Sequence, residues 1–264
     1  MDRLARFFRN GLYAFKGLYG FLKPQIYILV MIVNPIFQVV FFSLTARHAY
    51  GSGDITPYII GNAFVLCVYD AFFGVGTCLI YERSFGTLKL LVAAPCSKFN
   101  IFVGKATFYI FDGIITVSVG LLAAVVFFNV RIPSSYVPQL IICLIVSIFT
   151  ACSMGLLIGS VGLVTRDINL LLNLASMLLM SLSGVNFSTE KLPFFLQKIS
   201  SVIPLTNALK ACKLMLMSES TSYNQIYAFI AKEFVLGVIY CIAAYAAFRL
   251  MERYSKLKAA IDIY

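Results

Sequence analysis

Two carboxylates stand inside long apolar runs of this sequence, where an ionised group is costly. Asp70 lies in the run 58–80, and Asp112 lies in the run 106–128. A charge at the centre of a bilayer costs about 2.5–3.5 kcal/mol on insertion scales, so Asp70 needs a polar partner, water or a proton. Two roles satisfy this need: a transport-path or proton-relay carboxylate, and a structural carboxyl bonded to a neighbouring helix.

Uncharged amides occur at helical spacing in two other apolar runs. Asn34 and Gln38 are four residues apart, and so are Asn169 and Asn173. Residues four apart share one face of a helix. A polar face in lipid is expected to point into the protein or toward a solvated path. We therefore take these four residues, together with Asp70, as candidates that line a translocation path.

A charged pair occurs near the start of the apolar run 227–249, where Lys232 is followed by Glu233. Charged side chains near the end of a membrane helix commonly extend to the interface and anchor the helix there. The sequence favours this anchoring role for both residues.

The sequence lacks the motifs of the common enzyme classes. No G-x-x-x-x-G-K-[ST] phosphate loop occurs, since "VGKA" at 103–106 ends in Ala and lacks the upstream glycine. His48 is the only histidine, and the seven cysteines show no CxxC or metal-ligand spacing. We expect no catalytic residue, metal site or cofactor in this chain. The energy for any uphill transport must then come from an ion gradient or from another polypeptide.

The composition predicts an integral membrane protein. Of the 264 residues, 61% are hydrophobic and 12% are charged, and the mean hydropathy is +0.91. A soluble domain carries about 25% charged residues. Roughly 20 apolar residues cross a bilayer as a helix. Six runs are long enough, which predicts a single all-α domain over 1–264 with spans at 25–46, 58–80, 106–128, 138–164, 168–187 and 227–249.

The distribution of basic residues predicts the orientation. With six spans and the N-terminus in the cytosol, 14 of the 21 Lys and Arg fall on the cytosolic side. Short cytosolic connections of membrane proteins are enriched in these residues. This bias explains the net charge of +10 without a nucleic-acid partner. It predicts a multi-pass protein of the cell membrane with both termini in the cytoplasm.

Two segments outside the regular spans carry helical patterns. Residues 2–23 repeat apolar side chains at helical spacing with Arg and Lys on the other side, which predicts an interfacial helix on the inner leaflet, in contact with lipid. Residues 188–226 contain helical repeats interrupted at Pro193 and Pro204. They are too short and too broken to cross twice as regular helices. A re-entrant or outer-surface helix pair is therefore expected before the last span.

Small residues recur in the run 138–164 at Ala151, Gly155 and Gly159. Such a repeat lets helix backbones approach closely. The ridge can pack within the subunit or between subunits, and the first alternative is favoured.

The segment 81–105, "YERSFGTLKLLVAAPCSKFNIFVGK", is a charged stretch between two spans. Glu82 and Arg83 mark the membrane boundary, and Ser84 can cap a helix. Apolar residues then repeat at helical spacing until Pro95. This pattern predicts a cytosolic surface helix of about ten residues, some 15 Å long. Its apolar face can rest on lipid or enter a groove on a partner.

This segment resembles the one that follows the second span in type-2 permeases of ATP-binding-cassette (ABC) transporters. In that family an acidic-basic pair precedes Gly-Thr-Leu, an apolar stretch, a proline and a small polar residue follow, and Gly-Lys opens the next span. The matching residues here are Glu82-Arg83, Gly86-Thr87-Leu88, Pro95, Ser97 and Gly104-Lys105. "IPLTNALKACKLM" at 203–215 resembles the family's proline-centred motif before the last span. One departure is Lys89, where many members carry Glu.

The resemblance implies a division of labour. The loop would be the coupling helix, seated in a cleft of a separate ATPase subunit that binds ATP and Mg²⁺. Two permease copies, or this chain and a paralogue, would form the pore, with spans 1, 2 and 5 at the two-fold interface. The residues implied to couple to the ATPase are Glu82, Arg83, Phe85, Gly86, Thr87, Leu88, Lys89 and Pro95.

The loop most resembles the branch that exports drugs, antibiotics and lipophilic natural products. This likeness implies efflux of an amphipathic or hydrophobic compound, and the 24 Phe and 8 Met supply adaptable apolar surface that suits such a cargo. Three alternatives remain open. They are a permease that exports polysaccharide or glycolipid, a proton-coupled secondary transporter that uses Asp70 and Asp112, and a non-transporting membrane scaffold.

Overall fold

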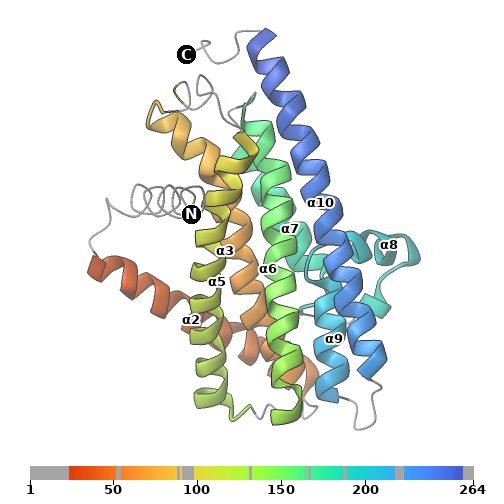
Figure 1. Ribbon diagram of the computed structural model, residues 1–264. Coiled ribbons are helices and arrows are strands. Elements are labelled where there is room, and N and C mark those ends of the chain that lie inside the picture. The colour runs from red at the N-terminus through yellow and green to blue at the C-terminus, as the bar shows by residue number, and fades with distance from the viewer. Residues whose placement is uncertain are drawn as a thin grey trace.

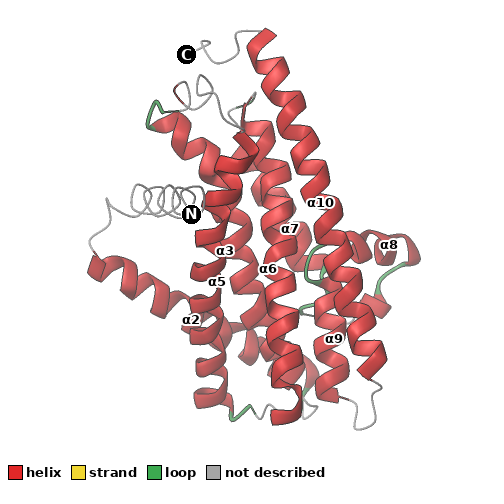
Figure 2. Cartoon of the chain, in the orientation of Figure 1, coloured by secondary structure: helices red, strands yellow, loops and turns green. Residues whose placement is uncertain are grey.

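The computed structural model describes residues 24–51, 55–87, 90, 98–130, 133–163, 165, 168–186, 189–217 and 223–257. Every regular element within these ranges is helical (Figure 2), which confirms the expected all-α membrane protein. The α-helices are α2 (Pro24–Tyr50), α3 (Thr56–Ser84), α5 (Lys98–Phe128), α6 (Val137–Ser160), α7 (Ile168–Leu182), α8 (Phe194–Val202), α9 (Thr206–Met217) and α10 (Tyr223–Leu257). Short 3₁₀ helices occupy Ser134–Tyr136, Val161–Leu163 and Thr189–Lys191. The predicted interfacial helix at 2–23 lies outside the described residues.

Four long helices, α3, α5, α6 and α10, run alongside one another and form the bundle (Figure 1). Within the described part of the chain, the stretches long and apolar enough to cross a membrane are Thr56–Glu82, Ile101–Phe128, Ser134–Leu163 and Tyr223–Tyr254. These stretches contain all of the predicted spans 58–80, 106–128 and 227–249, and all but the last residue of 138–164. The helices extend past the apolar windows, because backbone hydrogen bonding continues into a polar environment after the apolar sequence ends.

Packing in the bundle centres on α6, which contacts α10 and α3 extensively, while α3 also lies along α5. We call the end of the bundle where α3 ends and α5 begins the loop end, and the opposite end the far end. The C-terminal part of α10 also lies at the loop end (Figure 1).

The small residues of α6 explain its close contact with α3. A Cβ added to Gly155 would lie 2.7 Å from the carbonyl oxygen of Phe72, and one added to Gly159 would lie 3.3 Å from that of Gly76. The two backbones therefore touch where side chains are absent. This contact confirms that the small-residue ridge packs within the subunit.

Two helices differ from the regular spans. α2 has 27 residues and contains Pro35, and it runs obliquely across the bundle (Figure 1). α7 has 15 residues, about 22 Å of helix, which is too short to cross a bilayer alone. Membrane crossing by 25–46 and 168–187 stays a prediction.

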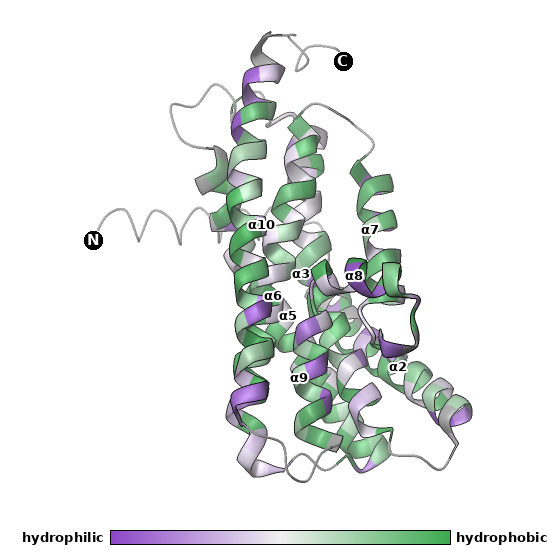
Figure 3. Cartoon of the chain, turned by 90° about the vertical axis from the view of Figure 1, so that its right-hand side faces the viewer, coloured by the Kyte–Doolittle hydropathy of each residue, from purple (hydrophilic) through white to green (hydrophobic). Residues whose placement is uncertain are grey.

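The segment between α7 and α10 turns back inside the fold. Ser200 of α8 donates a hydrogen bond from Oγ to the Leu182 carbonyl at the end of α7, at 2.6 Å. Tyr240 donates from its hydroxyl to the Val202 carbonyl at the end of α8, at 2.7 Å. α8 thus lies across the bundle axis beside the middle of α10, and α9 runs toward the far end (Figures 1 and 3). This position beside the middle of α10 is the one that a re-entrant pair would take, and the re-entrant arrangement stays a prediction.

Candidate functional site

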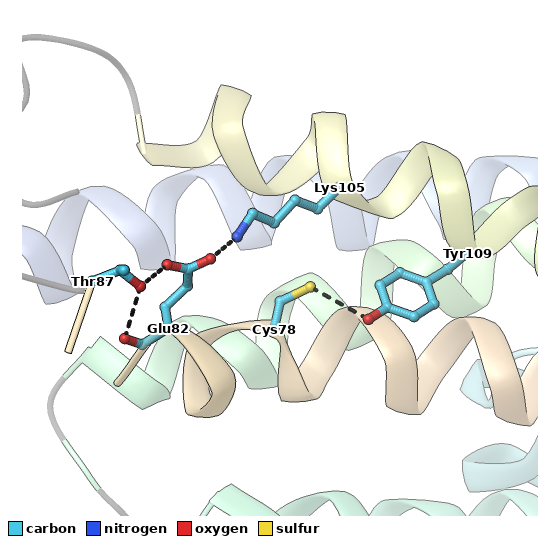
Figure 4. Close-up of polar contacts among 5 residues, drawn as sticks. All are labelled: Cys78, Glu82, Thr87, Lys105 and Tyr109. Atoms are coloured by element: carbon cyan, nitrogen blue, oxygen red, sulfur yellow. Dashed lines mark hydrogen bonds and ion pairs between the residues drawn. The ribbon is translucent and has the colours of Figure 1, made fainter. Parts of the chain in front are cut away.

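A buried polar link joins α3 to α5 at the loop end. Glu82 lies in the last turn of α3 and Lys105 in the second turn of α5. Because the two helices are antiparallel neighbours, these side chains meet, and the Lys105 ammonium forms an ion pair with the Glu82 carboxylate (Figure 4). The side chains are only 10% and 18% exposed, so solvent screens this pair less than a surface pair.

The same carboxylate holds the start of the loop. The Thr87 hydroxyl donates to the second carboxylate oxygen of Glu82 and also contacts the Glu82 carbonyl at 3.1 Å (Figure 4). The chain can fold back in this way because Gly86 has a φ of 70°, the left-handed conformation that commonly ends a helix at glycine. The beginning of the loop is therefore tied to α3 and, through Glu82, to α5.

The structure corrects the predicted role of Ser84. Its hydroxyl donates to the Ile80 carbonyl at 3.0 Å, one turn earlier in the same helix. The Phe85 amide continues the helical pattern with a bond to the Tyr81 carbonyl at 2.9 Å. Ser84 closes α3 and does not cap a following helix. The prediction was wrong because the local sequence cannot show how far α3 extends beyond its apolar stretch.

Apolar side chains are exposed around this link. Phe85 is 58% exposed and Leu90 is 73% exposed, as a surface that docks on another protein requires. Leu88, Lys89 and Pro95 lie outside the described residues, and so does the side chain of Arg83. The predicted surface helix around these positions stays a prediction.

The link continues inward through aromatic packing. Lys105 Nζ lies 5.5 Å from the centroid of the Phe102 ring, and that ring stacks on Phe248 of α10 with centroids 5.4 Å apart. One layer deeper, the Tyr109 hydroxyl lies 3.9 Å from Cys78 Sγ (Figure 4). Through these contacts Glu82 is connected to three of the four long helices, α3, α5 and α10.

Asp70 has a polar partner on the neighbouring helix. The side chain of Thr116 on α5 lies close enough to its carboxylate to act as a polar partner, and Asp112 lies near enough to act on its charge. The two helices approach closely here, since a Cβ on Gly113 would lie 2.8 Å from Cys67 Sγ. This partner is what a structural carboxyl needs, and it is also compatible with a position beside a path.

The other path candidates do not join Asp70 within one chain. Asn34 is exposed and Gln38 is half-buried on α2, while Asn169 and Asn173 are exposed on α7. The exposed amides of α7 stand among exposed Leu170, Leu174, Met177 and Leu178. Asp70 therefore lies at the contact between α3 and α5, whereas the four amides lie apart from it on α2 and α7.

Glu233 has a different role from the predicted one. It is fully buried, and its carboxylate accepts hydrogen bonds from the backbone amides of Leu205 at 2.7 Å and Asn207 at 3.2 Å. These amides open α9, and a helix N-terminus favours negative charge. The expected interfacial anchor is wrong for Glu233. Lys232 is exposed with Nζ 5.2 Å from the Phe229 ring centroid, as an anchor would be.

Two further residues were missed from the sequence. Lys213 of α9 donates from Nζ to the Gly184 carbonyl at 2.9 Å and lies 4.8 Å from the Tyr58 ring centroid. Thr116 was not recognised as the partner of Asp70. Of Glu233, Lys213 and Thr116, only Glu233 had a local signal, because α9 has no acidic residue in its first turn and needs an acceptor from elsewhere.

Comparison with known proteins places the chain in a family. The model of the ABC-2 type transporter family matches residues 17–216, which is most of the chain. The matched range includes the loop-end link and the helices α8 and α9. No curated protein matches the chain.

Proposed function

The chain belongs to the ABC-2 type transporter family, and from that premise we propose that it is the permease subunit of an ATP-driven exporter. The family consists of transmembrane components that work with ABC ATPase subunits. In the proposed complex ATP and Mg²⁺ bind to that partner, and this chain supplies the translocation pathway. The observation that carries the proposal is the polar link of Glu82, Lys105 and Thr87 at the base of the loop.

The link suits the transfer of force from a loop to membrane helices. Thr87 begins the loop, Glu82 lies in the last turn of α3 and Lys105 lies in α5, so a push on the loop reaches two spans at once. Charge-assisted hydrogen bonds are roughly twice as strong as neutral ones, so this link holds the start of the loop to both helices. In this proposal the exposed Phe85 and the loop residues beyond it seat in the ATPase.

The orientation follows from the same assignment. The ATPase is cytosolic, so the loop end faces the cytosol and the far end faces outward. The C-terminal part of α10, with Arg249 and Arg253, lies at the loop end, and Lys and Arg are enriched on the cytosolic side of membrane proteins. The protein is embedded in the membrane, and both termini are proposed to be cytoplasmic.

We propose that a second permease copy, identical or paralogous, covers the outward face of α7. Asn169 and Asn173 are exposed there beside apolar side chains, and amides facing hydrocarbon without partners are costly. The same reasoning applies to Asn34 on α2. A path between the two copies would bring together candidates that one chain leaves apart.

The proposed cargo is an amphipathic or hydrophobic compound, such as a drug, antibiotic, peptide or lipid-like product. A polysaccharide or glycolipid cargo is the first alternative. A proton-coupled transporter is a second candidate, favoured by the closeness of Asp70 and Asp112. Transport that persists without ATP and stops when the proton gradient is dissipated would select the second candidate.

Co-purification tests the central proposal. The tagged full-length protein, extracted in mild detergent from its native membrane, is expected to bring down an ABC ATPase, and the complex is expected to hydrolyse ATP. Reconstituted with that ATPase, it should move an amphipathic fluorophore only when ATP is present. If no ATPase accompanies the chain under any extraction condition, the proposal fails.

A further inference from the structure

The helix α8 carries a cation at an unusual depth. Tyr240, which binds the C-terminal end of α8, is 17 residues into the apolar stretch Tyr223–Tyr254 of α10. At 1.5 Å per residue this is about 25 Å from the far end of that helix. Lys198 is on α8, one turn before its end, and is exposed. The lysine therefore stands near mid-membrane depth and not at the far surface.

Lys198 lacks the partners that buried cations have. Its Nζ lies 4.7 Å from the Phe194 ring centroid, and among the described residues no carboxylate forms an ion pair with it. Lys213, on the adjacent helix, shows the contrast: it donates to the Gly184 carbonyl and has Glu190 as a charged neighbour. Lys213 is held inside the fold, whereas Lys198 points out of it.

An exposed ammonium at this depth is incompatible with a lipid environment. Charged side chains within membrane spans nearly always face the protein interior or a water-filled cavity. A lysine at a membrane end can extend its stem to the surface, but Lys198 is far from both ends of α10 by the position of Tyr240. In the working protein the exposed side of α8 must therefore face water, a ligand or another subunit, and the surroundings of Lys198 favour a ligand.

The neighbours of Lys198 indicate what that ligand is. Phe194 and Phe195 are each 72% exposed at the start of α8, and Ile199 is exposed beside Lys198. One surface thus offers a single cation together with aromatic and aliphatic area. We infer that the exposed face of α8, defined by Phe194, Phe195, Lys198 and Ile199, lines the translocation path and contacts an amphipathic anion. The ammonium pairs with its charged group, and the rings contact its apolar part.

This inference rests on the proposed export function and adds the charge of the cargo to it. α8 is well placed for the role because its position is fixed from three sides. Ser200 binds the end of α7, Tyr240 of α10 binds the end of α8, and Gln197 Nε2 donates to the Leu192 carbonyl at 2.8 Å. The exposed residues are thus presented by a held helix.

Thiol labelling tests whether α8 faces water. In the full chain, Lys198→Cys is compared with Ile242→Cys, which is 64% exposed at the same depth on α10. The reagent is the membrane-impermeant 2-sulfonatoethyl methanethiosulfonate, and the wild-type chain is the blank for its own cysteines. The Lys198→Cys variant is expected to react at least about tenfold faster than the Ile242→Cys variant, because charged reagents reach only water-exposed thiols.

Slow reaction of both variants would place α8 against lipid and overturn the inference. A Lys198→Cys variant that cross-links to a second copy and resists the reagent would place α8 in a subunit interface, with the same consequence. Labelling does not need the ATPase. Fast labelling without a co-purified ATPase would therefore contradict the export function but support a water-facing α8. Slow labelling with a co-purified ATPase would support the export function but contradict a water-facing α8.

Probe binding tests the charge of the ligand. Dansyl-aminoundecanoate and a dansyl probe of equal chain length ending in trimethylammonium are titrated against the purified complex. Lys198→Met is expected to weaken binding of the carboxylate roughly tenfold, the usual value of one charge-assisted hydrogen bond, and to spare the ammonium probe. Lys198→Arg should retain carboxylate binding and Lys198→Glu should reverse the preference. Equal changes for both probes, or no carboxylate binding by the wild type, would overturn the assignment.

Discussion

The turn after α3 and the turn before α9 are each held by one glutamate, but in different ways. Glu82 binds the side chains of Lys105 and Thr87 and remains 18% exposed, whereas Glu233 binds backbone amides and is fully buried. Side-chain partners can shift rotamers and follow a moving loop. Backbone amides at a helix start are fixed to the helix itself. The proposed coupling role therefore fits Glu82, whereas Glu233 fixes the start of α9.

The largest effect is expected at Glu233. Glu233→Ala removes the acceptor of two buried amides, each worth about 1–3 kcal/mol when left unsatisfied. We expect a loss of about 2–5 kcal/mol in stability, measured by thermal unfolding in detergent. Glu233→Gln should lose less, since its amide oxygen can still accept. Lys232→Ala, the exposed neighbour, is the control and should change stability by less than about 0.5 kcal/mol. If the Glu233 and Lys232 variants lose the same stability, Glu233 does not hold the start of α9, and its contrast with Glu82 fails.

At Glu82 the expected effect is on coupling. Lys105→Met breaks the ion pair and should reduce ATP-driven transport about tenfold while the complex still hydrolyses ATP. Transport and hydrolysis are measured together in proteoliposomes. Exchange of the charges in Glu82→Lys with Lys105→Glu should restore part of the transport. Arg249→Gln, at the same end and exposed, serves as the matched control. A proportional fall of hydrolysis and transport would contradict a transmitting role.

A smaller effect is expected from the turn itself. Gly86 has a φ of 70° with open space around its Cβ position, so Gly86→Ala costs only the left-handed conformation, about 1 kcal/mol. Thr87→Val removes the hydroxyl at similar volume and should cost about 0.5–1.5 kcal/mol. Both variants should elute as folded protein in size-exclusion chromatography. Their transport rate should fall, and the fall should be larger for the variant that loses more stability. Full transport by both would mean that the loop does not need this anchor.

The smallest effect is expected from salt. An increase from about 0.05 to 0.5 M NaCl shortens the screening length several-fold. The stability difference between wild type and Glu82→Gln should then shrink by less than about 1 kcal/mol, because that pair is partly solvated. The difference between wild type and Glu233→Ala should stay the same. A salt-dependent Glu233 would indicate that water reaches the start of α9.

Prediction from sequence succeeded where the pattern is local. The apolar runs 58–80, 106–128, 138–164 and 227–249 each became a long helix, since hydrocarbon requires internal backbone hydrogen bonding. The ridge around Gly155 and Gly159 packed as favoured. The loop motif located the polar link, although the pairing of Glu82 with Lys105 was not foreseen. An acidic residue that ends one span and a basic residue that begins the next would have indicated it.

The candidate path was harder to predict, because which way a helix face points depends on its neighbours. Asp70 found its partner in Thr116 of another helix, while Asn169 and Asn173 face outward from the chain. The same four-residue spacing describes a buried face and an exposed one. The sequence contains the spacing but no information on which neighbour covers it.

The amino-acid order alone determined that this protein is helical, lies in the membrane and carries a loop that resembles the one in ABC permeases. Those properties follow from hydropathy and short motifs, which act over a few turns of chain. Only the tertiary structure decided the role of Glu233 and the exposure of Lys198. Glu233 became the buried acceptor for the start of α9, and Lys198 became an exposed cation on the helix beside the middle of α10. The cost of a charge in a membrane depends on depth and partners, and both are set by how distant helices pack.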